Sequence, residues 1–202
     1  MASLVDSLME ELQSRGAVDQ IAGKLGVAPD QASSAVSAAV PAILAGLAKN
    51  TEKPEGAAAL AGALERDHDG SVLDDDRYFD SYQERKGDKI LGHVFGEKEP
   101  AVESQVSALA GMSGGQGADL MKMLAPLIMG YLGKQTSSGS LDLSSLTQML
   151  GGGAGGGGLN LPGGLGDLLG GLSGNGGSAS SGASKQKSTG LGGILGKIFG
   201  RK

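Results

Sequence analysis

The residues best suited to chemistry gather in the most polar stretch of the chain, ERDHDGSVLDDDRYFDSYQERKGDK. In the register of a calcium-binding loop, Glu65, Asp67 and Asp69 take positions one, three and five, Gly70 takes the sharp turn and Asp76 takes position twelve. Alternate residues of such a loop turn their oxygens toward one cation. Glutamate at position one and the short Asp76 at position twelve depart from the pattern. The spacing therefore allows a weak, non-catalytic calcium or magnesium site at Asp67, Asp69 and Asp76.

The same stretch has a simpler interpretation, in which its carboxylates form a solvated face. Gly70 then ends the preceding helix, and Ser71 or Asp74 caps the structure that follows. The spacing of the residues does not exclude either interpretation.

The remaining residues include few side chains that could carry out catalysis. The chain has no cysteine and two histidines, His68 and His93, and His93 lies inside the apolar run ILGHVFG. The aspartates between residues 67 and 80 could supply paired carboxylates, but no nucleophile accompanies them, and the Gly-rich C-terminal region contains no GxxxxGK[ST] phosphate loop. We expect a protein that is not an enzyme, holds no cofactor and has no small-molecule substrate.

A heptapeptide that occurs twice is the stronger candidate for an interaction site. ILGHVFG at residues 90–96 and ILGKIFG at residues 194–200 share five of seven positions. If the first copy docks into an apolar groove of the body, a tethered second copy could fill the equivalent groove of a neighbouring molecule, because the tether raises its effective concentration. The partner would be the protein itself or another protein. The contact residues would be Ile90, Leu91, Val94, Phe95, Ile194, Leu195, Ile198 and Phe199.

Two other interpretations of the second heptapeptide stay open. A segment rich in Gly, Leu and Ile produces such matches by drift, because its alphabet is small. The C-terminal segment could also lie on a membrane surface, since its apolar residues are flanked by Lys197, Arg201 and Lys202 and together resemble a short interfacial helix. Each glycine within it weakens such a helix by about 1 kcal/mol relative to alanine.

A second internal sequence match occurs in the predicted helices that would position these residues. Residues 21–49 align without a gap on residues 106–134. Unlike positions mostly keep their apolar character, so AAVPAILAGLAK and MLAPLIMGYLGK would bury the same face of the same helix. We therefore predict a duplicated helical unit. The identical pairs are Gly26 and Gly111, Gln31 and Gln116, Pro41 and Pro126, Ile43 and Ile128, Leu47 and Leu132, and Lys49 and Lys134.

Apolar spacing and helix stops predict an all-α fold. Helical periodicity covers residues 4–12, 18–25, 29–47, 55–64, 102–110, 120–132 and 141–150, and no strand pattern competes. Pro41 cannot donate a backbone hydrogen bond, so it should kink the third helix or divide it in two, and Pro126 should do the same in the second unit. With three Phe, three Tyr and no Trp, the core must consist of Ala, Leu, Val, Ile and Met.

The domain organisation follows from where the glycines lie. Of 38 glycines, 21 fall in residues 151–202, where Gly and Ser cannot offset the entropy of ordering. We expect those residues to form a flexible Gly/Ser-rich C-terminal tail with short apolar islands. Residues 1–150 should form one compact multihelical domain of two related helical units, about residues 18–64 and 103–150, joined by an acidic connector at residues 65–96.

Charge argues against a nucleic-acid partner. The net charge of −5 divides unevenly: residues 151–202 hold five basic residues and one acidic residue, which gives +4, so residues 1–150 carry −9. IAGKLGVAPDQASSAVSAAV is similar to a DNA-binding helix-turn-helix, but residues 31–48, which include its second helix, contain no Lys or Arg to meet phosphate. The helix-turn-helix is therefore better interpreted as a packing unit.

The sequence predicts a soluble cytoplasmic protein. The longest runs of low polarity, residues 35–48 and 120–133, hold about 14 residues each against the roughly 20 that a membrane span needs. The N-terminus carries Asp6, Glu10 and Glu11 where a signal peptide would carry positive charge. The absence of cysteine fits a reducing compartment.

Three segments together resemble a known family. RDHDGSVLDDD, GDKILGHVFG and APLIMGYLGK are similar to segments of the YidB-like bacterial proteins, a widespread domain of unknown function, and the resemblance covers most of residues 1–150. It implies a compact multihelical domain in a bacterial cytoplasm, often followed by a Gly-rich C-terminus. It implies no catalytic residues, because the family has no established activity.

Overall fold

The computed structural model describes residues 4–67, 70–75, 77–79, 84–113 and 115–139, and within them all regular structure is helical. The all-α fold class is therefore confirmed for this part of the chain. The predicted helix at residues 141–150 and the predicted tail lie outside the described residues. The elements are α1 (Leu4–Ser14), α2 (Ala17–Leu25), α3 (Pro29–Thr51), α4 (Pro54–Asp67), η1 (Ser71–Leu73), α5 (Glu84–Phe95), η2 (Gly96–Lys98), α6 (Glu99–Leu109) and α7 (Gln116–Ser137).

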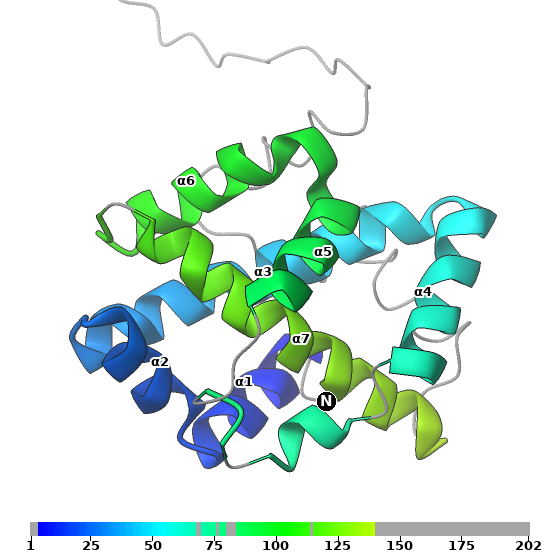
Figure 1. Cartoon of the computed structure of the whole chain (residues 1–202), viewed down its shortest axis with the longest axis horizontal. Coiled ribbons are helices and arrows are strands. Elements are labelled where there is room, and N and C mark those ends of the chain that lie inside the picture. The colour runs from blue at the N-terminus through cyan, green and yellow to red at the C-terminus, as the bar shows by residue number, and fades with distance from the viewer. Residues whose placement is uncertain (1–3, 68–69, 76, 80–83, 114, 140–202) are drawn as a thin grey trace, which may run out of the picture.

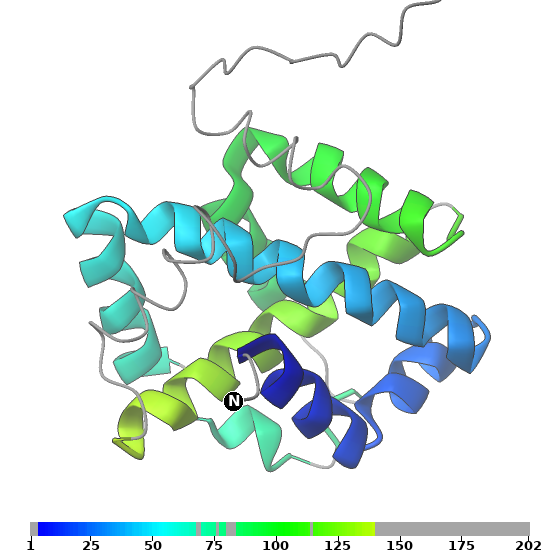
Figure 2. The ribbon, with the colours of Figure 1, turned by 180° about the vertical axis from the view of Figure 1, so that it is seen from behind.

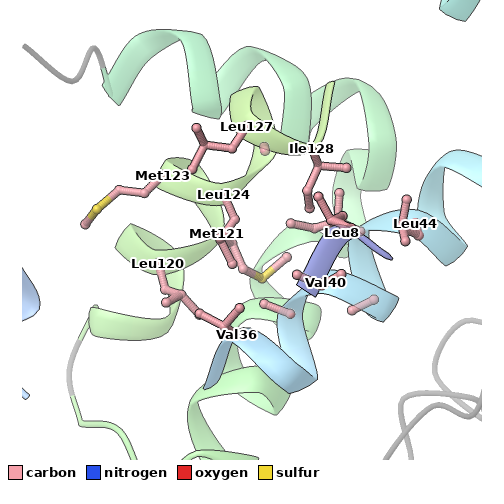
Figure 3. Close-up of a cluster of buried hydrophobic side chains, with 14 of the residues drawn as sticks. Leu8, Val36, Val40, Leu44, Leu120, Met121, Met123, Leu124, Leu127 and Ile128 are labelled. Carbon is pink, nitrogen blue, oxygen red and sulfur yellow. The ribbon is translucent and has the colours of Figure 1, made fainter. Parts of the chain in front are cut away.

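The two long helices, α3 and α7, cross at the centre of the body, and the shorter helices pack around the crossing (Figures 1 and 2). Both helices are apolar on nearly every side, which is typical of fully buried helices. Figure 3 shows their side chains meeting in one buried cluster, with Val36 of α3 beside Leu120 of α7 and Val40 beside Met121.

Helix α3 is the one described helix that is long and apolar enough to cross a membrane. Its most apolar window is 72% buried inside the body, as expected for the core helix of a soluble protein. The sequence-based estimate of a 14-residue apolar run was too short, because Ala, Ser and Gln residues of its first turns also belong to the helix.

Pro41 and Pro126 lie inside continuous helices, so of the two expected effects, a kink or a division of the helix, the division is wrong. A proline in a helix interior leaves the carbonyl four residues earlier without its usual partner. In α7 that carbonyl belongs to Lys122, and α5 packs directly against it, as described below. Burial on all sides keeps each helix in one piece despite the missing hydrogen bond.

The turns that join α2 to α3 and α6 to α7 end their first helices in the same way. Gly26 and Gly111 both adopt left-handed φ values, 65° and 61°, which glycine tolerates without steric cost. In both turns the following residue donates its backbone N–H to a carbonyl five residues earlier, from Val27 to Ala22 and from Met112 to Ser107. These bonds lie 85 positions apart in the sequence, which is the offset of the internal sequence match.

Two glutamines hold the two turns together by a reciprocal exchange of hydrogen bonds. The Nε2 of Gln31, at the start of α3, donates to the carbonyls of Ala110 (3.3 Å) and Gly111 (2.7 Å) at the end of α6. The Nε2 of Gln116, at the start of α7, donates to the carbonyl of Leu25 (3.0 Å) at the end of α2. Each long helix thus satisfies carbonyls that the other hairpin leaves free at a helix end.

We predict that Gln31→Ala and Gln116→Ala each lower the free energy of unfolding by about 1 kcal/mol, because a helix-end carbonyl then loses its donor. Urea denaturation followed by helical circular dichroism measures the change. The control is Gln20→Ala, which alters an exposed glutamine of α2. Equal stability of all four proteins would show that the reciprocal bonds contribute nothing to the fold.

Candidate interaction site

The candidate site is the place where the C-terminal half of α5 packs on α3 and α7. We call it the α5 site and define it by Gly46 and Asn50 of α3 and the backbone of Lys122 of α7. Of the predicted contact residues, Leu91, Val94 and Phe95 are buried in the main core, and Ile90 is half-buried against it. Ile194, Leu195, Ile198 and Phe199 lie outside the described residues.

Gly46 lets α5 approach α3 closely. A Cβ atom at this position would overlap Cγ1 of Val94 and would lie 2.7 Å from Cε1 of Phe95. Any larger residue would push the end of α5 away, because a packed interior cannot absorb an added methyl group without shifts. The glycine therefore forms the floor of the site.

Asn50 caps the end of α5 from one turn further along α3. Its Nδ2 donates to the carbonyls of His93 (2.9 Å) and Val94 (3.2 Å), which belong to the last turn and have no partner within the helix. Gly96 then turns the chain with a φ of 55°. The α5 site thus combines an apolar floor with a side-chain donor for a helix end.

At its other end α5 lies against the backbone of α7. A Cβ at Gly87 would overlap the carbonyl oxygen of Lys122 and would lie 2.7 Å from its carbonyl carbon. This carbonyl is the one that Pro126 leaves without its helical partner. The next carbonyl, of Met123, accepts a hydrogen bond from the Tyr78 hydroxyl at 2.8 Å. Neighbouring elements therefore pack where the proline interrupts the helical bonding of α7.

The predicted ion site is only partly within the described residues. Glu65 and Asp67 lie on α4 and are exposed, whereas Asp69 and Asp76 fall outside the description. Residues two apart on a helix point in different directions, so Glu65 and Asp67 cannot face one cation while α4 keeps its last turn. Among the described residues no three His, Asp or Glu side chains are grouped so that they could hold a metal ion. The ion site stays a prediction from spacing.

The acidic connector is tied to the body through cations instead. Asp74 Oδ1 lies 3.5 Å from Arg15 Nη2 and 3.6 Å from Lys134 Nζ. Arg15 also donates to the carbonyl of Leu73. Next to these contacts, Val72 packs on Gly130 of α7, where a Cβ would overlap it. The segment from Gly70 to Asp74 therefore docks on α7 rather than standing free as a loop.

A cluster of carboxylates surrounds Lys122 between α5, α6 and α7. Lys122 pairs with Asp88 at 3.0 Å. Burial raises the pKa of Glu103, and the charge of Glu99 raises it further, while Lys122 opposes both effects. Burial also raises the pKa of Glu99, with a smaller contribution from Asp88. Each of these two carboxylates therefore favours protonation more than an isolated glutamate does.

Glu103 also lines a shallow groove of about 460 Å³ between α6 and α7. Serine side chains and the small residues of both helices make up most of the remaining lining, together with Met112. The sequence analysis did not single out Glu103, Asn50 or Gly46, because their partners lie many positions away. Gln31 and Gln116 did carry a signal, as identical residues of the internal match.

Comparison with known proteins points to a family without an assigned activity. The model of a family described as "Bacterial protein of unknown function (DUF937)" matches residues 6–135, well over half of the chain. No curated protein and no solved structure shows significant similarity to the chain. The match supports the resemblance to the YidB-like proteins that the sequence motifs indicated.

We predict that Gly46→Ala and Gly87→Ala each lower the free energy of unfolding by about 1–3 kcal/mol, because the added methyl group overlaps a packed neighbour. Gly23→Ala is the matched control, since Gly23 lies in α2 with no neighbouring atom near its Cβ position. That change should raise stability by about 0.5–1 kcal/mol through helix propensity. Denaturation by urea measures all three, and a stabilised Gly46→Ala variant would contradict the close approach of α5.

We predict that Glu103→Gln raises the melting temperature at pH 7 and loses this advantage as the pH falls toward 4.5, the ordinary glutamate value. A folded pKa above the unfolded one means that the folded protein binds more protons between the two values, so stability falls as pH rises through that window. The neutral glutamine removes this penalty. Thermal scans across the pH range test it against Glu65→Gln on the exposed face of α4; identical behaviour of both variants would contradict it.

Proposed function

The chain belongs to this bacterial family of unknown function, and from that premise we propose that it is a non-enzymatic self-assembly module of the bacterial cytoplasm. In this proposal the heptapeptide at residues 194–200 of one molecule binds the helical body of another. The partner is thus a second copy of the chain, and neither a nucleic acid nor a small-molecule substrate is involved.

The observation that carries the proposal is where the two heptapeptides agree. The positions of the first copy that are buried, Leu91, Val94 and Phe95, are apolar in both copies, and Gly96, which needs a left-handed φ, is glycine in both. The one change of chemical character falls at His93, which is exposed. The equivalent residues of the second copy are Leu195, Ile198, Phe199, Gly200 and, at the exposed position, Lys197.

Identity alone does not separate buried from exposed positions, because Val94 is replaced by Ile198. A second copy that kept the docking residues of the first would keep the apolar character of the buried positions, as this one does, because those residues make the contacts with the body. The Gly/Ser-rich chain before the second heptapeptide also supports binding between molecules. Residues 151–193 would join the predicted domain to the second heptapeptide by a chain whose Gly/Ser content predicts a span of roughly 36 Å, so a neighbouring molecule lies within reach.

We predict that the full-length chain is larger in solution than its 20.0 kDa mass and becomes monomeric when residues 190–202 are deleted. Leu195→Asp combined with Phe199→Asp should have the same effect, because two carboxylates cannot be buried in an apolar site without a large desolvation cost. Light scattering coupled to gel filtration measures the mass in each case.

The control is Ser180→Asp combined with Ser184→Asp, which adds the same two charges at the same spacing outside the heptapeptide. It should assemble like the unaltered chain. A full-length protein that is already monomeric at high concentration would exclude self-assembly through this segment. If that monomer pelleted with anionic vesicles, and the Leu195→Asp, Phe199→Asp variant did not, the C-terminal segment would instead be a membrane-surface anchor.

A further inference from the structure

The second heptapeptide needs an apolar place to bind, and the described surface offers little. Among the described residues, Leu109 is the one exposed large hydrophobic side chain, at 36%. The groove between α6 and α7 is shallow, and Glu103 and Ser104 make its lining partly polar. An open groove that could bury a leucine, an isoleucine and a phenylalanine is therefore not found in this part of the molecule.

The α5 site does have the required shape, but α5 fills it. Its floor at Gly46 accepts Val94 and Phe95, and Asn50 supplies donors for the carbonyls at the end of a short helix. Both features involve only backbone atoms and apolar side chains of α5. The second heptapeptide has apolar side chains at the equivalent positions. The side chain of His93 in α5 is exposed and contributes to neither feature. Lys197, the equivalent residue of the second heptapeptide, is therefore acceptable at this position.

The sequence similarity between the two segments does not extend to the residues just before the heptapeptides. Gly87 lies three residues before Ile90, where it touches the backbone of Lys122. The equivalent residue before Ile194 is Leu191, whose side chain would collide with that backbone. The second segment can therefore replace the last two turns of α5, but it cannot replace the first turn. The extra methyl group of Ile198 relative to Val94 must also fit beside Gly46.

We propose that assembly proceeds by exchange: residues 194–200 of one molecule displace residues 90–96 of another and take their place over Gly46 and Asn50. This inference rests on the proposed function and names the surface that it uses. Because one apolar heptapeptide replaces another of nearly the same composition, the contacts with the body are close to balanced. The loss of translational freedom on association then opposes the exchange, so a high concentration of the chain is needed to drive it. The end of α5 must open before the second segment can enter, so assembly is slow relative to diffusion.

Hydrogen exchange on the full-length protein tests the displacement. In the assembled protein the backbone amides of residues 91–96 should exchange on the order of 100-fold faster than in the Leu195→Asp, Phe199→Asp variant, in which α5 keeps its site. Amides at the centre of α7 serve as the internal control and should not differ. Equal protection of residues 91–96 in an assembled sample and in the variant would overturn the exchange, while the proposed function would stand. A sample that never assembles fails the proposed function itself.

A chemical trap tests the same placement directly, because the chain has no cysteine of its own. Gly46→Cys combined with Ile198→Cys should give disulfide-linked dimers on oxidation, since Ile198 takes the place of Val94 beside Gly46. Gly46→Cys combined with Ser184→Cys controls for the effect of the first substitution and for random contact. Linkage at least tenfold above the control supports exchange between molecules. Linkage no greater than the control in an assembled protein overturns it, as does linkage found only within single chains.

Discussion

The crossing of α3 and α7 is the contact on which the other contacts of the body depend. The central turns of these helices are almost wholly buried, and every other described α-helix lies against one or both of them (Figure 1). Their buried side chains differ in size: α3 contributes several alanines, among them Ala35 and Ala39, and α7 contributes larger Leu and Met side chains. The core thus needs few aromatic residues, because alanine and glycine bring backbones together while leucine and methionine fill the remaining space.

The same close approach defines the α5 site. Gly46 and Gly87 let α5 lie on α3 and α7 at distances that no residue with a Cβ would permit. Asn50 then satisfies the helix end that this approach buries. A site of this kind recognises backbone, buried apolar side chains and a helix-ending glycine, and it is indifferent to the exposed residue. Any segment that supplies those features can compete for it, and the chain itself contains one.

The charges of the body are arranged differently on its two sides. Around Lys122, several carboxylates share one cation, and burial raises the pKa of Glu99 and Glu103. Near η1, Asp74 has two cations for neighbours, Arg15 and Lys134, and Arg15 also pairs with Glu11. The first arrangement costs stability at neutral pH and lies beside α5 and α6. The second fastens the acidic connector to α7. Among the described residues, the carboxylates whose pKa is raised by burial and by like charges therefore lie beside α5 and α6.

Much of the helical framework could be predicted from the sequence. Apolar spacing located α1, α2, α3, α4, α6 and α7, Gly26 marked the end of α2, and Pro29 marked the start of α3, because these signals act over one or two turns of chain. The sequence analysis did not predict α5. Of the two effects expected of Pro41, a kink or a division of α3, the division does not occur, because burial along much of the helix keeps it continuous. The part of the fold that could not be predicted is the packing between helices, for which local signals carry no information.

By itself, the sequence determined six of the seven described α-helices, that residues 21–49 and 106–134 share a pattern, and that one heptapeptide occurs twice. Only the tertiary structure decided that Asn50 caps α5, that Gln31 and Gln116 exchange bonds between the two hairpins, and that Glu103 lies in a desolvated carboxylate cluster. The physical reason is distance along the chain. Helix formation depends on neighbours three or four residues apart, whereas these contacts join residues separated by about 20 to 90 positions and exist only once the long helices have crossed.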